Sequence, residues 1–138
     1  MTLAVSLLAC YLIGSLPFSF IFAKLRRGVD PRQAGTGNVG ASNTLIVAGK
    51  LAAIFALIGD IAKGVGAIIL ARHLGLNDWG IALSALAVVL GHDFSIFLGF
   101  KGGKGVATTG GILLALDPLF AAIIILLLVL CILTLQRF

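Results

Sequence analysis

The chain has 138 residues, of which 60% are hydrophobic and only 11% are charged. A soluble domain of this length could not bury so much apolar surface, so an ordinary soluble enzyme, a disordered tail and a secreted disulfide scaffold are excluded. Ten Lys and Arg against five Asp give a formal net charge of +5. We expect no nucleic-acid partner, because a basic stripe needs a water-facing surface that this chain hardly has. The composition predicts an all-α integral membrane protein, a polytopic helical bundle.

Uncharged runs divide the chain into about five hydrophobic segments. At roughly 20 residues per crossing, they are predicted at about residues 2–23, 51–71, 79–100, from 106 to 116, and 119–136. Pro17 is predicted to kink the first segment and to free a backbone carbonyl that Ser15 or a neighbouring span can address. Asp117-Pro118 separates the fourth segment from the fifth, because proline cannot donate a backbone N–H and disfavours helix in the residue before it.

The basic residues predict an orientation in the membrane. The first segment has neither a basic region before it nor a cleavage site, so it is predicted to be an uncleaved span with its N-terminus outside. Basic residues cluster in loops at about 24–50 and 99–105, which are therefore predicted to be cytoplasmic, and Arg137 would join them if the fourth segment crosses. Cys10 and Cys131 lie in apolar runs and are predicted to be buried hydrophobic residues, not disulfide or zinc ligands.

The first basic loop contains a run of small and polar residues that formally satisfies G-x-G-x-x-G: Gly35, Thr36, Gly37, Asn38, Val39, Gly40, Ala41, Ser42 and Asn43. A dinucleotide site is rejected, because that fingerprint requires a preceding strand in a βαβ unit. The glycines still allow successive N–H groups to face one concavity, where the Thr, Ser and Asn side chains could help to hold an anionic oxygen. A helix-capping turn is an equally open interpretation.

The second basic loop is built for phosphate, with two cations around a glycine pair: Lys101, Gly102, Gly103, Lys104 and Gly105. A lysine is a point charge suited to a phosphoryl group, and glycines let backbone N–H groups approach closely. The loop is not a nucleotide-hydrolase P-loop, because Gly105 stands where that motif has Ser or Thr. The alternative is a simple positive-inside anchor.

Three further charged or titratable groups lie near these loops. His92 is predicted near the cytoplasmic surface, where it could move a proton or bind phosphate, although a satisfied interfacial histidine is an equal alternative. Asp60 and Lys63 are three residues apart on one helical face and are predicted to form a structural ion pair. A His-x4-Asp dyad at His73 and Asp78 is rejected, because the predicted orientation places it outside, away from both basic loops.

Together, these motifs resemble the bacterial acyl-phosphate-dependent glycerol-3-phosphate acyltransferases, over the whole chain. The resemblance rests on the Ser-Leu-Pro-Phe element ending at Phe18, the Gly-Asn run at 35–43, Asp60 with Lys63-Gly64, and the string from Gly91-His92 to Thr108. It implies acyl transfer from acyl phosphate to the 1-hydroxyl of glycerol 3-phosphate, which gives lysophosphatidic acid and phosphate for phospholipid synthesis. It also implies the bacterial inner membrane, with the active site facing the cytoplasm and the acyl tail among membrane lipid.

The resemblance also implies roles for the loop residues. Acyl phosphate has a good leaving group, so orientation and charge stabilisation would suffice, and no metal or cofactor is expected. The predicted catalytic residues are His92, Lys104 and Thr36. The predicted substrate-binding residues are Gly35, Gly37, Asn38, Asn43, Lys101, Gly102, Gly103 and Gly105.

The chain departs from the family in two respects. Ile46 stands where the family usually has an arginine expected to hold phosphate, and Arg32 or Arg27 are candidates to replace it. Family members normally continue past Phe138, so we expect a single transmembrane domain over residues 1–138 that lacks the family's C-terminal part. The alternatives are a membrane anion-binding or transport subunit, and an impaired homologue or fragment. The sequence leaves the oligomeric state open.

Overall fold

Helices make up the regular secondary structure of residues 1–135, the part of the chain that the computed structural model describes. The side chains of residues 128, 129 and 131–135 fall outside this description, so the predictions for Cys131, Gln136 and Arg137 lie outside the described residues. The elements are α1 (Thr2–Ser15), α2 (Phe18–Arg27), α3 (Ala41–Ala48), α4 (Lys50–His73), α5 (Asp78–Asp93), a 3-10 helix η1 (Ile96–Leu98), α6 (Val106–Leu116) and α7 (Pro118–Leu135).

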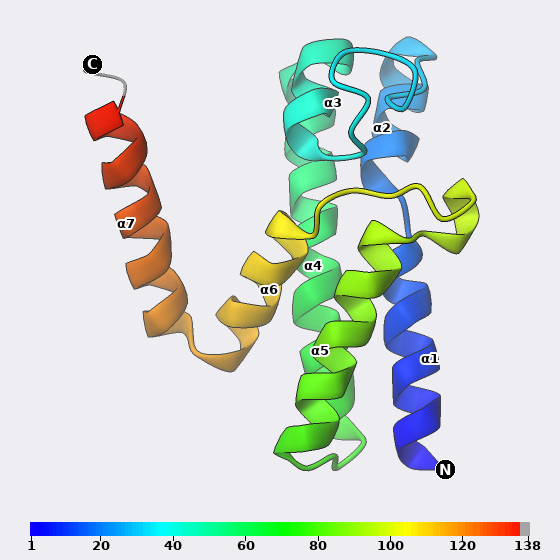
Figure 1. The fold of residues 1–138 in the computed structure, drawn as a ribbon, viewed down its shortest axis with the longest axis vertical. Coiled ribbons are helices and arrows are strands. Elements are labelled where there is room, and N and C mark those ends of the chain that lie inside the picture. The colour runs from blue at the N-terminus through cyan, green and yellow to red at the C-terminus, as the bar shows by residue number, and fades with distance from the viewer. Residues whose placement is uncertain (136–138) are drawn as a thin grey trace.

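Three helical stretches of the described chain are long and apolar enough to cross a membrane: Thr2–Arg27, Lys50–His73 and Asp78–Leu98. The shorter apolar helices Val106–Leu116 and Pro118–Leu127 follow them. The predicted all-helical class and the five apolar segments are confirmed, whereas the number of full crossings and the external N-terminus stay predictions. Figure 1 shows α1, α4 and α5 side by side, and both views show α7 leaning away from them.

The first span is broken as predicted at Pro17. Helix α1 ends at Ser15 and α2 begins at Phe18, because Pro17 has no N–H to continue the ladder. The ammonium group of Lys63, on α4, donates to the carbonyl oxygens of Gly14 and Leu16 at 2.9 and 3.0 Å. A side chain of the neighbouring helix α4 therefore forms hydrogen bonds with the carbonyls at the break.

The third predicted segment agrees with the apolar stretch Asp78–Leu98, although α5 ends at Asp93 and the 3-10 helix η1 completes the stretch. The chain turns back after η1, and the backbone N–H groups of Gly102 and Gly103 donate to the carbonyls of Asp93 and His92 at 2.9 and 3.1 Å. These two bonds satisfy terminal carbonyls that another helical turn would otherwise have used. The loop caps the helix from which it departs.

Small residues let the helices approach closely. A Cβ added to a glycine at the α1–α5 or α4–α6 interface would collide with a backbone carbonyl of the facing helix, so only glycine allows the observed separation. The four contacts are Gly14 on Val88, Gly91 on Tyr11, Gly64 on Thr108 and Gly111 on Ile61. They make α4 a fixed support for α6, and α1 a fixed support for α5.

Candidate functional site

A cavity of about 430 Å³ lies between the two glycine-rich loops, which we define as the first loop (residues 28–40) and the second loop (residues 99–105). Its volume suits a small ligand. The lining combines polar residues of the loops, α3 and α5 with one apolar and one acidic residue of α4 and the apolar start of α6: Thr36, Asn38, Gly40, Ala41, Ser42, Asn43, Leu57, Asp60, His92, Lys104, Gly105, Val106 and Ala107. Thr36 and Lys104 thus border one space although they lie 68 positions apart in the sequence.

Two helix N-termini open onto this cavity. Helix α3 starts there after Gly40, and α6 starts there after Gly105, and neither has a side-chain cap. The first N–H groups of a helix have no intrahelical partner and carry partial positive charge, so they favour an anion. Lys104, an exposed cation, borders the same space. Two helix ends and one ammonium group make the cavity suitable for a phosphate.

Asn43 organises the first loop from inside. Its side chain is only 1% exposed. The amide oxygen accepts from the N–H of Thr36 at 2.8 Å, and the amide nitrogen donates to carbonyls of Pro31, Ala34 and Asn38 at 2.8 to 3.1 Å. The polar atoms of Asn43 are therefore engaged within the loop, where they position Thr36 and Asn38 beside the cavity.

Gly35 and Gly37 shape the same loop and are not among the residues that line the cavity. Both have positive φ angles, 61° and 75°, which glycine adopts without strain. A Cβ at position 35 would also collide with the amide of Asn43. The predicted binding role of these two glycines stays a prediction, and the geometry gives them a structural task.

The second loop uses its glycine pair for contact with α5. The N–H groups of Gly102 and Gly103 already bond to α5 carbonyls, so they are not aimed at a ligand in the cavity. A Cβ at position 102 would collide with the carbonyl of His92, and one at position 103 with the imidazole nitrogen Nε2. Lys101 is exposed and does not line the cavity, whereas Lys104 and Gly105 do.

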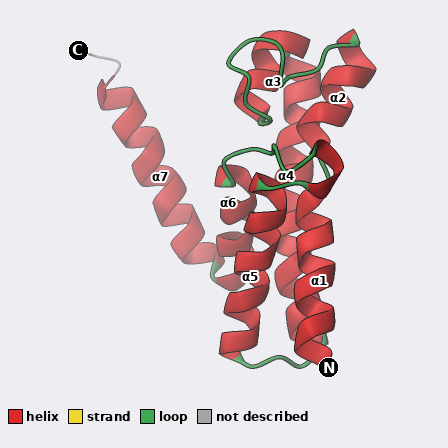
Figure 2. Cartoon of the chain, turned by 45° about the vertical axis from the view of Figure 1, so that its right-hand side comes forward, coloured by secondary structure: helices red, strands yellow, loops and turns green. Residues whose placement is uncertain are grey.

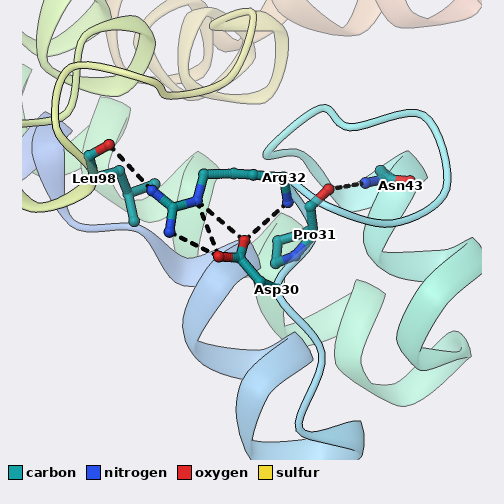
Figure 3. A network of polar contacts seen from close by, with 5 residues as sticks. All are labelled: Asp30, Pro31, Arg32, Asn43 and Leu98. Carbon is teal, nitrogen blue, oxygen red and sulfur yellow. Dashed lines mark hydrogen bonds and ion pairs between the residues drawn. The ribbon is translucent and has the colours of Figure 1, made fainter.

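Arg32, which the sequence analysis considered as a phosphate-holding arginine, is engaged by other groups of the protein. Its guanidinium binds the Asp30 carboxylate at 2.7 Å through Nη2 and at 3.0 Å through Nε, and donates through Nη1 to the carbonyl of Leu98 at 3.2 Å (Figure 3). The guanidinium also lies 5.3 Å from the centre of the Phe20 ring. Arg32 links the first loop to η1, and it is absent from the residues that line the cavity.

The ion pair between Arg32 and Asp30, which we call the clamp, shifts the pKa values of both residues. Hydrogen bonds from the Arg32 side chain hold the pKa of the Asp30 carboxyl below its ordinary value, and the same pairing raises the pKa of Arg32. Ile46 is 65% exposed on α3, and Arg27 is exposed at the end of α2. Among the cations considered for the site, Lys104 is the one that lines the cavity.

Beneath the loops, Asp60, Lys63 and His92 form a buried cluster. Lys63 Nζ lies 2.9 Å from Asp60 Oδ1, which confirms the predicted ion pair, and His92 Nδ1 lies 3.5 Å from the same oxygen. All three residues are buried, and His92 is only 7% exposed. The sequence pattern identified the ion pair but not its contact with His92, because only the packing of α4 against α5 brings the two together.

An apolar groove of about 480 Å³ adjoins the polar cavity, lined by α4, α6 and α7. The two spaces share Lys104, Val106 and Ala107, so a polar space and an apolar space meet at one lysine. Within the described residues, His, Cys and Asp side chains form no group of three suited to a metal ion. An amphiphile with an anionic head matches this geometry.

Comparison with known proteins places this geometry in a family. A family model described as glycerol-3-phosphate acyltransferase matches residues 4–138. A glycerol-3-phosphate acyltransferase of Dechloromonas aromatica (strain RCB) is 53% identical over 119 residues, which cover 86% of this chain and 60% of that relative. One of Coxiella burnetii (strain CbuG_Q212) is 46% identical over 125 residues, which cover 91% of this chain and 65% of the relative. The chain thus spans less than two thirds of the length of these curated relatives.

Solved structures agree in fold. The glycerol 3-phosphate form of PlsY (YgiH), an integral membrane glycerol 3-phosphate acyltransferase, is 38% identical with a TM-score of 0.84 over 91% of this chain and 63% of that chain. The match to its lysophosphatidic acid form has a TM-score of 0.81 and covers 91% of this chain and 62% of that chain. The integral membrane fold is thereby confirmed. With two loops meeting at one cavity, and a family model that matches almost every residue, the chain belongs to the glycerol-3-phosphate acyltransferase family.

Proposed function

We propose that the chain carries the transfer of an acyl group from acyl phosphate to the 1-hydroxyl of glycerol 3-phosphate, with lysophosphatidic acid and inorganic phosphate as products. The observation that carries the proposal is the cavity between the loops, where Lys104 and the starts of α3 and α6 meet. Both substrates bear a phosphate, which these groups favour. The names of the relatives, and the glycerol 3-phosphate and lysophosphatidic acid forms of PlsY, support this substrate class.

The proposed reaction mainly requires that the hydroxyl of glycerol 3-phosphate is oriented toward the acyl carbon of acyl phosphate. The hydroxyl oxygen attacks the acyl carbon, a new C–O ester bond forms, and the anhydride C–O bond breaks so that phosphate leaves. In our proposal Lys104 neutralises charge on a phosphate, and Thr36 and Asn38 orient the polar head. His92, at the inner wall of the cavity, takes the hydroxyl proton or holds the hydroxyl in place. Lys101 then contributes positive potential near the entrance.

The apolar groove suits the acyl chain. A chain lying along α6 and α7 would place its reactive carboxyl end at Lys104, where the groove meets the polar cavity. Apolar side chains from α4, α6 and α7 replace water around the methylene groups, which favours binding by about 0.8 kcal/mol per buried CH₂. We also propose that the cavity faces the cytoplasm of the bacterial inner membrane, since the first loop and its flanks carry Lys24, Arg26, Arg27 and Arg32, and the second carries Lys101 and Lys104.

The test is an assay of the chain reconstituted in phospholipid vesicles, with radiolabelled glycerol 3-phosphate and either palmitoyl phosphate or palmitoyl-CoA. We expect labelled lysophosphatidate from the acyl phosphate alone. Binding or flux of phosphate without product would instead indicate the anion-binding or transport alternative. Absence of both product and glycerol 3-phosphate binding would reject the proposed activity for this chain.

A further inference from the structure

The buried cluster of Asp60, Lys63 and His92 has a task that the acyl-transfer scheme leaves unassigned. Lys63 has three N–H donors. The Nζ atom lies 2.9 Å from Asp60 Oδ1, and it also donates to the carbonyls of Gly14 and Leu16 at the break in the first span, so each N–H has an acceptor. The ammonium group is thus fully satisfied inside the protein, and it ties α4 to the junction of α1 and α2.

Asp60 belongs both to the buried cluster and to the lining of the cavity. A bare carboxylate beside that cavity would repel a phosphorylated substrate. The ammonium of Lys63 cancels this charge, and the effect is strong because both side chains are buried. The pair therefore adds no net charge to the wall of a cavity that Lys104 and the two helix ends make positive.

Asp60 also faces His92 at 3.5 Å, on the Nδ1 side of the imidazole. On the other side, Nε2 lies against Gly103, where no larger residue fits. The ring is held between a carboxylate on α4 and the second loop, so its place at the cavity wall depends on Asp60. A side chain fixed from both sides is the condition for an oriented acid or base.

A small cavity of about 10 Å³ lies in the same cluster, lined in part by Ser15, Asp60, Lys63, His92 and Ser95. This is about the space that one water molecule needs. The hydroxyl of Ser15 is buried and has no partner within the described residues. A water there would join Ser15 to the cluster and extend the link between the helix break and His92.

We propose that Asp60 and Lys63 are positioning residues of the acyltransferase site with two separable tasks. Lys63 neutralises the carboxylate of Asp60, which would otherwise repel a phosphate, and Asp60 holds the imidazole of His92 in place. The inference rests on the proposed function. It differs from a purely structural ion pair, in which the two residues would matter for folding alone. The two tasks predict different kinetic effects, because substrate affinity depends on charge and turnover depends on the orientation of His92.

The experiment compares Lys63→Met, Asp60→Asn and the double variant in steady-state kinetics with glycerol 3-phosphate and in thermal unfolding. We expect Lys63→Met to raise KM about 10-fold or more and to lower the unfolding temperature, because Asp60 is left unpaired. The double variant should regain the unfolding temperature and a KM within about threefold of the wild type, while kcat stays reduced about 10 to 100-fold. Lys24→Met and Asp78→Asn, exposed and remote from the cluster, are the matched controls.

Two results would overturn the proposal. The first is a double variant whose kcat returns to the wild-type value, since His92 would then need no carboxylate. The second result comes from the variant Lys63→Arg, which can be measured even if the double variant does not fold. Lys63→Arg keeps the charge and should keep KM near the wild-type value, so a KM raised as much as in Lys63→Met would reject charge cancellation.

A second readout needs no turnover and separates this inference from the proposed function. The chain has two histidines, and His73 is exposed, so a His73→Gln background leaves His92 as the target of diethylpyrocarbonate. We expect His92 to react about 10-fold faster in Asp60→Asn than in the background chain, because the ring is released from its place. Equal rates would reject the positioning role even if acyl transfer is observed. Faster reaction in a chain that forms no product would reject only the proposed function.

Discussion

The two glycine-rich loops border one cavity, but they use glycine for opposite purposes. In the first loop, Gly35 and Gly37 adopt positive φ angles so that the backbone can curl around the amide of Asn43. In the second loop, Gly102 and Gly103 allow the backbone to lie directly on the end of α5. One loop is shaped from within, and the other is held by a helix.

The cations of the loops differ in the same way. Arg32 of the first loop is engaged with Asp30, Leu98 and Phe20, whereas Lys104 of the second loop borders the cavity. A basic residue in a glycine-rich loop is therefore not automatically a ligand-binding group. In the proposed reaction, this difference assigns polar orientation to the first loop and positive charge to the second.

The largest effect is expected from adding one carbon where the second loop touches α5. Gly103→Ala should lower activity about 100-fold or more and destabilise the fold by about 1–3 kcal/mol, since its Cβ would collide with the His92 imidazole and the Val39 carbonyl. Kinetics and thermal unfolding measure both effects. Gly66→Ala, in open space on α4, is the matched control and should be neutral or stabilising by up to about 1 kcal/mol. Equal behaviour of the two variants would refute the contact.

The next largest effect is expected from Lys104, which lines the cavity, in comparison with Lys101, which does not. Lys104→Ala should reduce turnover or glycerol 3-phosphate affinity about 10 to 1000-fold if this lysine stabilises transferring charge. Lys101→Ala, which changes a cation outside the cavity lining, should lose less than about 10-fold. The kcat and KM values of both variants decide the point. Equal losses would mean that the loop acts by its net charge, and not by placing one ammonium group.

Much of this arrangement follows from local sequence, and the rest does not. The apolar segments, the break at Pro17 and the Asp60–Lys63 pair were predicted correctly, because each depends on neighbours within one or two helical turns. The sequence did not predict that α5 ends at Asp93 within the third apolar segment, because the N–H groups that cap the helix come from residues about ten positions later. The nearness of Asp30 to Arg32 was a signal that this arginine could be engaged locally.

The sequence placed both loops on one side of the membrane, but the contacts that build the cavity depend on the tertiary structure. The starts of α3 and α6 meet at one cavity only because α4 supports both helices. The amide of Asn43 resembles a ligand-binding group in the sequence, but its partners are backbone carbonyls whose positions depend on the folded loop. A polar residue in such a run can therefore stabilise the loop through hydrogen bonds to its backbone, as Asn43 does.

The interior of the first loop is sensitive to the loss of two donors. Asn43→Asp keeps the shape but replaces the donating nitrogen with an oxygen facing three carbonyls, so we expect destabilisation of about 1–3 kcal/mol and roughly 10-fold lower activity. Thermal unfolding and limited proteolysis of the loop report the change. Gln33→Glu introduces the same chemistry at an exposed position of the same loop and should have little effect. A stable, fully active Asn43→Asp chain would contradict the internal role of this amide.

The smallest effect concerns the clamp between Asp30 and Arg32, and it depends on pH. Because Arg32 holds the folded-state pKa of Asp30 below its ordinary value of about 3.9, the stabilisation is fully present above that value. It is lost as the pH falls through the lower folded-state pKa, where the carboxylate takes up a proton. We therefore expect Asp30→Asn to unfold at a slightly lower temperature than the wild type at pH 7, and the difference to shrink in acid and to vanish once the pH is below the lowered folded-state pKa. A difference that persists unchanged in acid would show that the charge of Asp30 does not stabilise the first loop.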